Sequence, residues 1–254
     1  MNWQLFWATQ RKSRLTTQAR KSMGFLKKGF QFLKARYAPR GARVSFSQSG
    51  EDLIMSDTLR KSGITKPLYV DIGAHHPIFA NNTYLLYRQG GRGILVEPNK
   101  ELCYVIQNTR PRDVCLNAGV GGHDSEEEFF SFPRSTRSTF SKVQAEAWQR
   151  ESEERPTIEK KPIYSLDTII NTHCDRVPDV VSIDAEGLDI EILSGFSWTR
   201  RPKIFCIESA VYDDGGIKHV DSELASLMKQ HDYTLVAKVL CNDIFVDVRS
   251  SQSL

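Results

Sequence analysis

Two short apolar segments, each ending in an acidic residue, constrain the fold of this chain more than any other feature. Residues 69–74 read Tyr-Val-Asp-Ile-Gly-Ala, and residues 93–98 read Gly-Ile-Leu-Val-Glu-Pro about one β-α unit later. In a parallel α/β sheet, ligands bind outside the carboxyl ends of the strands, where the strand order reverses. We therefore expect Asp71, Gly73 and Glu97 to meet at one crevice. A glycine lets the backbone approach a ligand closely, and a carboxylate can accept both hydroxyls of a ribose. The pattern predicts a nucleoside-cofactor site.

From residue 44 onward, strand-like runs alternate with helix-like runs, which is typical of α/β proteins. The expected strands are Leu68–Ile72, Gly93–Val96, Val114–Asn117, Asp179–Asp184 and Lys203–Ser209, the first three being buried and parallel. The chain then carries two β-rich runs, Tyr233–Leu240 and Asp243–Val248, separated by Cys241-Asn242, which predicts an antiparallel hairpin. The expected fold class is therefore α/β: a doubly wound, mostly parallel, seven-stranded Rossmann-like sheet with a C-terminal antiparallel hairpin, over residues 44–254.

Residues 123–162 interrupt this alternation and are interpreted as an insertion between the third and fourth βα units. The segment contains three consecutive acids at residues 126–128 and a strand-like run at Phe129–Phe132. An insertion at this place is a candidate lid over a bound substrate. Arg134 and Arg137 are candidates to hold an anionic substrate, with solvated surface charge as the alternative.

Residues 1–43 carry a charge opposite in sign to that of the remaining chain. They contain eleven Lys or Arg residues and no acid; since the whole chain has a formal net charge of +3, subtracting eleven leaves −8 for residues 44–254. Apolar residues recur at three- and four-residue steps from Met23 to Tyr37, which predicts a basic amphipathic helix. One interpretation is a helix bound to an anionic membrane; the other is a helix packed on the body or on a second subunit of a homo-oligomer. Nucleic acid is not expected, because no recognisable binding motif accompanies the charge.

The cysteines and the hydropathy pattern indicate the compartment. Five cysteines, an odd number without C-x-x-C spacing, favour reduced thiols over a disulfide or zinc framework. No apolar stretch approaches the roughly 20 residues that span a bilayer, and the N-terminus lacks the apolar core of a secretion signal. We expect a cytoplasmic protein, with peripheral contact at the inner face of the membrane through residues 1–43 as the open alternative.

Eight short motifs occur in an order and spacing that resemble the FkbM-type family of S-adenosylmethionine (SAM)-dependent O-methyltransferases. They are Ser47–Asp52 (SQSGED), Val70–Pro77 (VDIGAHHP), Asn82–Tyr84, Gly93–Asn99 (GILVEPN), Arg110–Asp113, Ser138–Phe140, Ser165–Asp167 and Ile183–Asp189 (IDAEGLD). The resemblance covers roughly residues 44–210. It implies a doubly wound sheet, SAM as methyl donor and often a sugar or natural-product hydroxyl as acceptor.

Carried over residue by residue, the resemblance implies where the cofactor binds. The methionine half is expected at Asp71, Gly73 and the turn that follows, the ribose hydroxyls at Glu97, and adenine beside Asn117. The full set of expected cofactor-binding residues is Gln48, Asp71, Gly73, Ala74, Asn82, Thr83, Glu97, Pro98, Asn117, Ala118 and Asp184. For Asn82 and Thr83, a helix N-cap is a sufficient structural alternative.

The glycine turn departs from a common SAM fingerprint of three alternating glycines. Here Gly73 is followed by His75 and Pro77. The same departure argues against NAD, whose pyrophosphate needs glycines for a close approach at a helix N-terminus.

Methyl transfer to an aliphatic hydroxyl needs a group that orients the hydroxyl and removes its proton. Asp184 and Glu186, which alternate along the chain where the fourth strand opens, are candidates, and so are His75 and His76. We expect one histidine to point into the cleft and the other to pack or to bond to backbone. The structural alternative for Glu186 is capping of the following helix. A divalent cation, Mg²⁺ or Mn²⁺, is a less favoured possibility, with Asp184, Glu186 and Glu208 as its ligands.

Two hypotheses of different class follow. The first is a SAM-dependent O-methyltransferase that acts on a hydroxyl, with a sugar of a glycan or glycolipid as the favoured acceptor. The second is a non-catalytic Rossmann-fold module tethered through its basic arm, and the joint presence of Asp71, Glu97 and Asp184 speaks against it. A nicotinamide oxidoreductase fits neither the glycine turn nor the terminal hairpin.

Overall fold

The computed structural model describes residues 41–132, 137–185, 187–213, 216–219 and 221–249. The chain divides into two compact units, Met1–Val44 and Ser45–Leu254, and all described helices and strands belong to the second unit. The predicted amphipathic helix lies outside the described residues.

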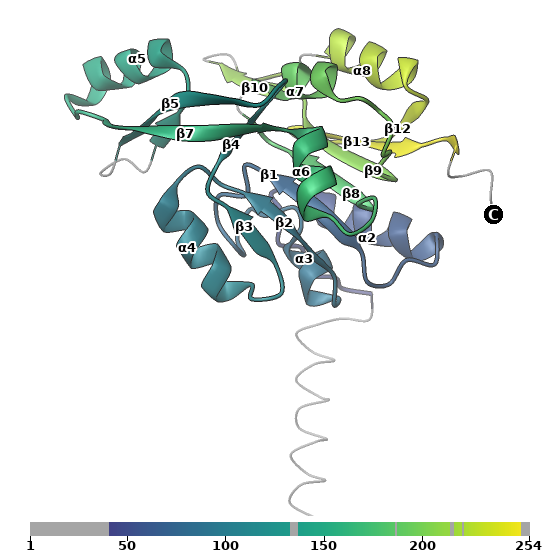
Figure 1. The fold of residues 1–254 in the computed structure, drawn as a ribbon. Helices are drawn as coiled ribbons and strands as arrows, with labels where there is room; N and C mark the ends of the chain where they lie inside the picture. Colours follow the sequence, from purple (N-terminus) through teal and green to yellow (C-terminus); the bar gives the residue numbers. More distant parts are fainter. Residues whose placement is uncertain (1–40, 133–136, 186, 214–215, 220, 250–254) are drawn as a thin grey trace, which may run out of the picture. The chain divides into compact units, whose positions relative to one another are not determined.

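A seven-stranded mixed sheet forms the core of the second unit (Figure 1). In spatial order its strands are β12 (Tyr233–Val239), β13 (Asn242–Asp247), β9 (Ile204–Glu208), β8 (Val180–Ile183), β1 (Leu68–Ile72), β2 (Arg92–Val96) and β3 (Val114–Leu116). The five strands from β9 to β3 are parallel, whereas β13 pairs antiparallel with both β9 and β12. The predicted α/β class and the terminal hairpin are confirmed. The strand order reverses at β1, so the carboxyl ends of β1, β2 and β8 flank the switch point.

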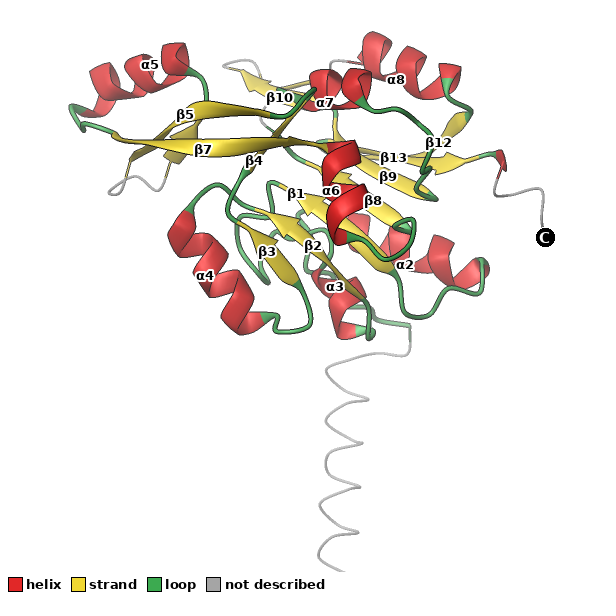
Figure 2. Ribbon diagram, viewed as in Figure 1, coloured by secondary structure: helices red, strands yellow, loops and turns green. Residues whose placement is uncertain are grey.

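Helices cover both faces of this sheet, as Figure 2 shows. One face packs against α2 (Glu51–Lys61), α3 (Tyr84–Arg88) and α4 (Lys100–Thr109), and the other against α6 (Leu166–His173), α7 (Asp189–Gly195) and α8 (Asp221–Gln230). Side chains alternate along β1: Tyr69 belongs to the core on the α2 side, and Val70 and Ile72 to the core on the α6 side. Asp71, which follows the same alternation, therefore faces α2, α3 and α4.

A second sheet of four strands replaces the predicted insertion. Its order is β4 (Gly119–Gly121), β7 (Thr157–Ser165), β5 (Ser125–Phe132) and β6 (Arg137–Thr139), and α5 (Lys142–Ser152) follows β6. Phe130 and Phe132 of β5 pack with Ala145 and Trp148 of α5 on the outer face. The segment is wider than residues 123–162, since β4 precedes it and β7 continues to Ser165.

Three further details differ from the sequence-based expectation. The third strand is not buried, because β3 is the edge strand of its sheet and Val114 is 46% exposed. A hairpin of β10 (Ala210–Asp213) and β11 (Gly216–His219) was not predicted. The turn between β12 and β13 is Leu240-Cys241, one residue earlier than expected. All five cysteines are free thiols in this structure. Among the described residues, no helix is long and apolar enough to cross a membrane.

Candidate active site

A cavity of about 480 Å³ lies between the carboxyl ends of the main-sheet strands and the inner face of the second sheet. Six of the predicted site residues line it: Gly73, His75, Glu97, Pro98, Ala118 and Asp184. They come from the ends of β1, β2, β3 and β8, which is where the switch point places a ligand. The structure therefore brings these six residues together at one cavity, and their roles stay predictions.

A glycine is required at position 73 because two backbone segments, at the ends of β1 and β8, approach each other closely there. Its φ is +74°, and a Cβ atom added there would lie 1.9 Å from the carbonyl oxygen of Asp184. The backbone N–H of Gly73 donates to Val96 O at 3.1 Å, and that of Asp184 donates to Ile72 O at 3.1 Å. The ends of β1, β2 and β8 are thus held together at a point where no side chain fits.

Glu97 is buried at the end of β2, with 4% of its surface exposed, and it lines the cavity. Its Oε2 accepts the backbone N–H of His75 at 2.9 Å, and its Oε1 accepts that of Asn99 at 2.8 Å. Burial raises the pKa of this carboxyl to about 7, against the lowering effect of the two backbone hydrogen bonds. A carboxylate has about four lone-pair positions, so each oxygen can accept a further donor from a ligand.

The two histidines separate as predicted. His75, with a φ of 47°, is exposed and lines the cavity. His76 instead accepts the backbone N–H groups of Ile78 and Phe79 on its Nδ1, at 3.1 and 3.0 Å. His76 is thus engaged in holding the turn after β1, and of these two histidines only His75 lines the cavity.

Asp71 does not line the cavity, contrary to the expected contact with the methionine half of a cofactor. Its Oδ2 accepts the hydroxyl of Thr83 at 2.6 Å and the amide of Asn81 at 3.2 Å. The same Asn81 amide donates to Ala74 O at 3.1 Å. Asp71 is 3% exposed, and burial raises its pKa. The carboxyl group therefore supports the turn that carries the cavity residues, from behind the sheet.

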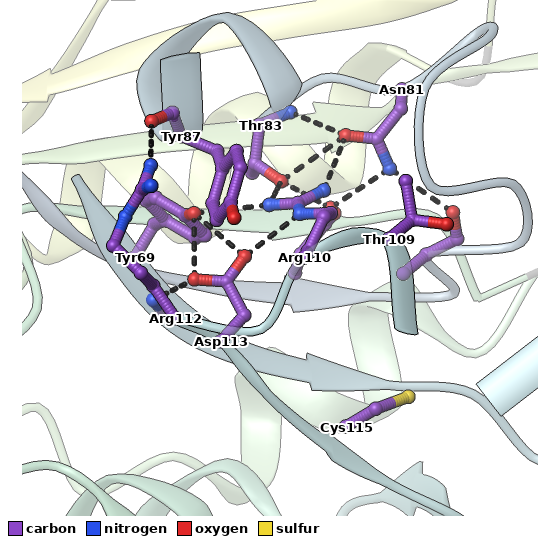
Figure 3. Close-up of polar contacts among 12 residues, drawn as sticks. Tyr69, Asn81, Thr83, Tyr87, Thr109, Arg110, Arg112, Asp113 and Cys115 are labelled. Carbon is purple, nitrogen blue, oxygen red and sulfur yellow. Dashed lines mark hydrogen bonds and ion pairs between the residues drawn. The ribbon is translucent and has the colours of Figure 1, made fainter. Parts of the chain in front are cut away.

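A buried arginine organises the polar side chains that hold Asp71, and Figure 3 shows its contacts with Asp113, Asn81, Tyr69 and Thr83. The Arg110 guanidinium donates to Asp113 at 2.7 Å, to Asn81 at 3.1 Å, and to Tyr69 and Thr83 at 3.0 Å each. Asp113 also accepts the hydroxyl of Tyr69 and the backbone N–H of Gly93. The Arg110–Asp113 motif of the sequence is therefore an internal ion pair that joins α4 to β1 and β2.

The remaining predicted cofactor residues hold backbone or other side chains. Asn117 donates to Glu97 O at 3.0 Å and to Pro98 O at 2.8 Å, so it fixes the segment that carries Glu97. Asn82 donates to the Ser182 hydroxyl at 3.1 Å. Thr83 occupies the N-cap position of α3 without a side-chain cap, since its hydroxyl bonds to Asp71. Neither Asn117 nor Asn82 lines the cavity.

The element before β1 is also placed outside the cavity lining. Gln48 is exposed, whereas Glu51 and Asp52 at the start of α2 are fully buried. Asp52 accepts the hydroxyls of Ser45 and Ser47, and Glu51 accepts the amide of Asn242. These acids therefore fix the start of α2.

The loop after β8 carries the predicted catalytic acids. Asp184 lines the cavity, while Glu186 lies outside the described residues. Asp189 accepts the backbone N–H groups of Ala185 and Gly187, both at 3.3 Å, and so braces this loop. Glu208 ends β9 and is not part of the lining. In the part of the chain that the structure describes, no group of three or more acidic, His or Cys side chains could hold a metal ion. Binding of a divalent cation by Asp184, Glu186 and Glu208 stays a prediction.

Most of the cavity residues that the sequence did not predict belong to the second sheet and its connections. Among them are His123, Ser125, Glu127, Phe129 and Ile163, together with Ser138, Thr139 and Phe140, which were noted only as a motif. Glu191 of α7 lines the cavity from the other side. The alternation of Ser125, Glu127 and Phe129 was the signal that could have revealed those on β5. Arg137, a candidate to hold an anionic substrate, pairs with Glu151 at 3.5 Å and lies 5.5 Å from the Trp148 ring, with its side chain 49% exposed, in agreement with the surface-charge alternative. Both partners belong to α5. Arg134 lies outside the described residues.

Fold and site together define a methyltransferase-type Rossmann-like domain, with a cavity at the switch point of a sheet that ends in an antiparallel hairpin. The family model of the methyltransferase FkbM domain matches residues 71–235, more than half of the chain. The chain belongs to this family and is a methyltransferase, so the non-catalytic module and the nicotinamide oxidoreductase are not supported. A search of curated protein sequences finds no match.

Several solved methyltransferase structures are similar at low identity. One is a TehB-like SAM-dependent methyltransferase from Corynebacterium glutamicum (10% identity, 90% of this chain and 99% of that chain covered, TM-score 0.40). Another is magnesium protoporphyrin IX methyltransferase from Synechocystis PCC 6803 with bound SAM (8%, 85% and 89%, TM-score 0.38). A third is an O-methyltransferase from Bacillus cereus in complex with SAH (12%, 87% and 88%, TM-score 0.36).

Proposed function

We propose that this methyltransferase uses SAM as its donor and methylates a hydroxyl of a sugar in a glycan or glycolipid. The observation that carries the cofactor assignment is the Glu97 carboxylate, which is buried at the end of β2, faces the cavity and retains acceptor capacity on both oxygens. A ribose presents two adjacent hydroxyl donors, which match two carboxylate oxygens.

The other residues at the strand ends fit the remainder of SAM. Pro98 and Ala118 give the cavity a small apolar surface near Glu97, which suits the face of a purine. The turn from Gly73 to His75 presents backbone at the end of β1, which suits the amino-acid half. When bound, SAM supplies a methyl group on a sulfonium, which an acceptor oxygen takes as the carbon–sulfur bond breaks and its electron pair stays on sulfur.

The protein must hold the acceptor hydroxyl and take its proton. Asp184 is the favoured base, because it lines the cavity and its backbone packs directly on Gly73. His75 lines the same cavity and is the alternative base. Glu186, which lies outside the described residues, stays a candidate from the sequence alone.

The inner face of the second sheet supports a sugar acceptor. It combines the rings of Phe129 and Phe140, whose centroids lie 4.9 Å apart, with the hydroxyls of Ser125 and Ser138. Aromatic rings offer apolar contact to the C–H faces of a sugar, while hydroxyl and carboxylate groups bond to its hydroxyls. The basic residues 1–43 motivate the lipid-linked form of the acceptor.

Isothermal titration with SAM and with S-adenosylhomocysteine (SAH) tests the cofactor assignment. Glu97→Gln should weaken binding of both by tenfold or more, since an amide cannot accept both hydroxyls. Glu101→Gln, an exposed acid in the first turn of α4, is the matched control and should bind normally. Equal affinity in the wild type and Glu97→Gln would refute the assignment.

Mass spectrometry of glycans tests the reaction. Cells that produce the wild type should show a methyl-sized increase in mass on a glycan or glycolipid, and cells with Asp184→Asn should not. SAH binding should survive in Asp184→Asn. A normal methylation level in that variant would exclude Asp184 as the base.

A further inference from the structure

Strand β5 places one of three consecutive acids in the cavity. Ser125, Glu127 and Phe129 line the cavity, as the two-residue period of a strand requires. Glu126 points the other way and pairs with Lys160 at 2.9 Å, in an exposed ion pair. The hydroxyl of Ser125 donates to Glu127 Oε1 at 3.2 Å. Glu127 is thus a carboxylate presented to the cavity next to a hydroxyl.

The nearest cation on the neighbouring strand is already engaged. Lys161 stands opposite Glu127 in the register of β7 with β5. Its ammonium group bonds to Glu159 at 2.8 Å and to the Asn117 side chain at 2.9 Å, with only 8% of the side chain exposed. Lys161 therefore holds Asn117 and the Glu97 segment, and it is not among the cavity-lining residues.

The described lining of the cavity has a one-sided charge. It contains four carboxylates, Glu97, Glu127, Asp184 and Glu191, together with two histidines, His75 and His123. No Lys or Arg is among these described residues. Arg137, the candidate partner for an anion, lies with α5 on the outer face. An anion entering this cavity would lose hydration and meet like charge, with no Lys or Arg among the described lining residues to pair with it.

An apolar wall lies beside Glu127. Phe140 packs against Gly119, where a Cβ atom would stand 2.6 Å from the Phe140 ring, and Phe129 adjoins Phe140. The absence of a side chain at Gly119 lets the ring approach the strand. The inner face of the second sheet therefore offers rings, hydroxyls and a carboxylate side by side.

We propose that this inner face, centred on Glu127, is the acceptor subsite and that it selects uncharged or cationic hydroxylated acceptors, such as neutral and amino sugars, over anionic ones such as uronates. The inference rests on the proposed function and specifies its acceptor class. A carboxylate accepts strong hydrogen bonds from sugar hydroxyls and attracts an ammonium group, whereas it repels a second carboxylate. Repulsion of anionic acceptors is enough to make the site selective, even if the neutral and cationic acceptors make no specific contact of their own.

Three glycosides test the proposal: one is neutral, one carries a single positive charge and one carries a single negative charge. Methyl glucoside, methyl 2-amino-2-deoxyglucoside and methyl glucuronide are titrated into the full-length protein with and without SAH, and binding is followed by saturation-transfer NMR. The uronate should bind at least about tenfold more weakly than the neutral sugar, and the difference should shrink at high salt. Glu127→Gln should reduce the preference for the amino sugar over the uronate several-fold.

Glu126→Gln is the matched control, since it removes the adjacent acid of the same strand from the opposite face, and it should leave the preference unchanged. Uronate binding as tight as that of the neutral sugar, equal effects of the two variants, or no binding of either favoured sugar would overturn the proposal. SAH titration of the wild type separates this failure from a failure of the proposed function. If the protein binds SAH but prefers the uronate, the proposed function stands and the proposed acceptor class is wrong.

Discussion

Glu97 is buried, yet the proposed binding of ribose hydroxyls needs its charged form. Its pKa is raised to about 7, mainly by burial, so in the free protein the group takes up a proton near neutral pH. A raised acid pKa means that the folded state binds the proton more tightly than the unfolded chain. This contribution to stability is therefore present at low pH and is lost as pH rises through about 7.

Ribose binding should have the opposite pH dependence. Two hydroxyl donors favour the ionised carboxylate, so SAH affinity should rise as the pH increases toward and past about 7 and then level off. Below that point the loss should approach tenfold per pH unit. Titration calorimetry at several pH values measures this dependence, and Glu97→Gln should abolish it. An unchanged slope in the variant would assign the effect to another group.

Alanine substitutions at Gly73 and Gly63 distinguish the cost of backbone strain from the cost of a steric clash. Both have a φ of +74°, but a Cβ atom at Gly63 would meet nothing within 4 Å, whereas at Gly73 it would stand 1.9 Å from Asp184 O. Gly63→Ala should cost about 1–2 kcal/mol of unfolding free energy, the strain of a left-handed alanine. Gly73→Ala should cost clearly more, about 3 kcal/mol or above, and should weaken SAH binding. Urea denaturation compares the two; similar losses would show that the strand ends separate easily.

At the scale of elements, the segment from α4 to β3 depends on an ion pair that no water reaches. Arg110 and Asp113 lie 2.7 Å apart with both side chains fully buried, whereas Arg176 and Asp179, also three residues apart, lie 2.6 Å apart with the arginine 47% exposed. Removing one partner of a buried pair leaves an uncompensated charge. Arg110 also bonds to Asn81, which holds the turn after β1.

Arg110→Met should therefore destabilise the protein by about 3–5 kcal/mol, and Arg176→Met by no more than about 1 kcal/mol. Urea denaturation at neutral pH measures both losses. SAH affinity should fall in Arg110→Met alone, because the turn that carries His75 loses its support. Equal losses of stability would mean that water reaches the Arg110 cluster in solution.

The five parallel strands of the main sheet could be predicted because each is a short apolar run, and the acids near the ends of β1 and β2 marked the edge where the cavity forms. β7 could not be predicted in the same way. Its first four residues are exposed and two of them are charged, so its sequence resembles a charged linker. The strand exists because it pairs with β4 and β5, and such long-range pairing leaves no local signal.

Among the site residues, too, some could be predicted from the sequence and others could not. Glu97 could be predicted because its place at a strand end determines its surroundings. The direction of Asp71 also follows from strand alternation, once Val70 and Ile72 are assigned to the opposite face. The burial of Arg110 could not be read from the sequence, since a charged Arg-Pro-Arg-Asp motif usually indicates a surface loop and the three tyrosine rings near its guanidinium come from distant segments.

At the scale of the whole molecule, the basic and acidic parts of the chain coincide with its two compact units. The boundary between the units follows Val44, next to the end of the stretch that carries eleven cations and no acid. All three hydrophobic clusters of the described residues are made of residues from Ile54 onward. Because the second unit contains these clusters within itself, we predict that it folds without residues 1–40.

We propose that the role of the basic stretch is contact with anionic membrane, and vesicle co-sedimentation tests it. The full chain should pellet with vesicles that contain phosphatidylserine but not with neutral phosphatidylcholine vesicles, because each Lys or Arg near an anionic surface contributes about 1 kcal/mol. Higher salt should release it, since screening shortens the reach of these charges. A protein limited to residues 41–254 should stay in the supernatant with an unchanged melting temperature and normal SAH binding. Equal pelleting of both proteins would exclude the basic stretch as the membrane contact, and a lowered melting temperature would indicate instead that residues 1–40 pack on the second unit.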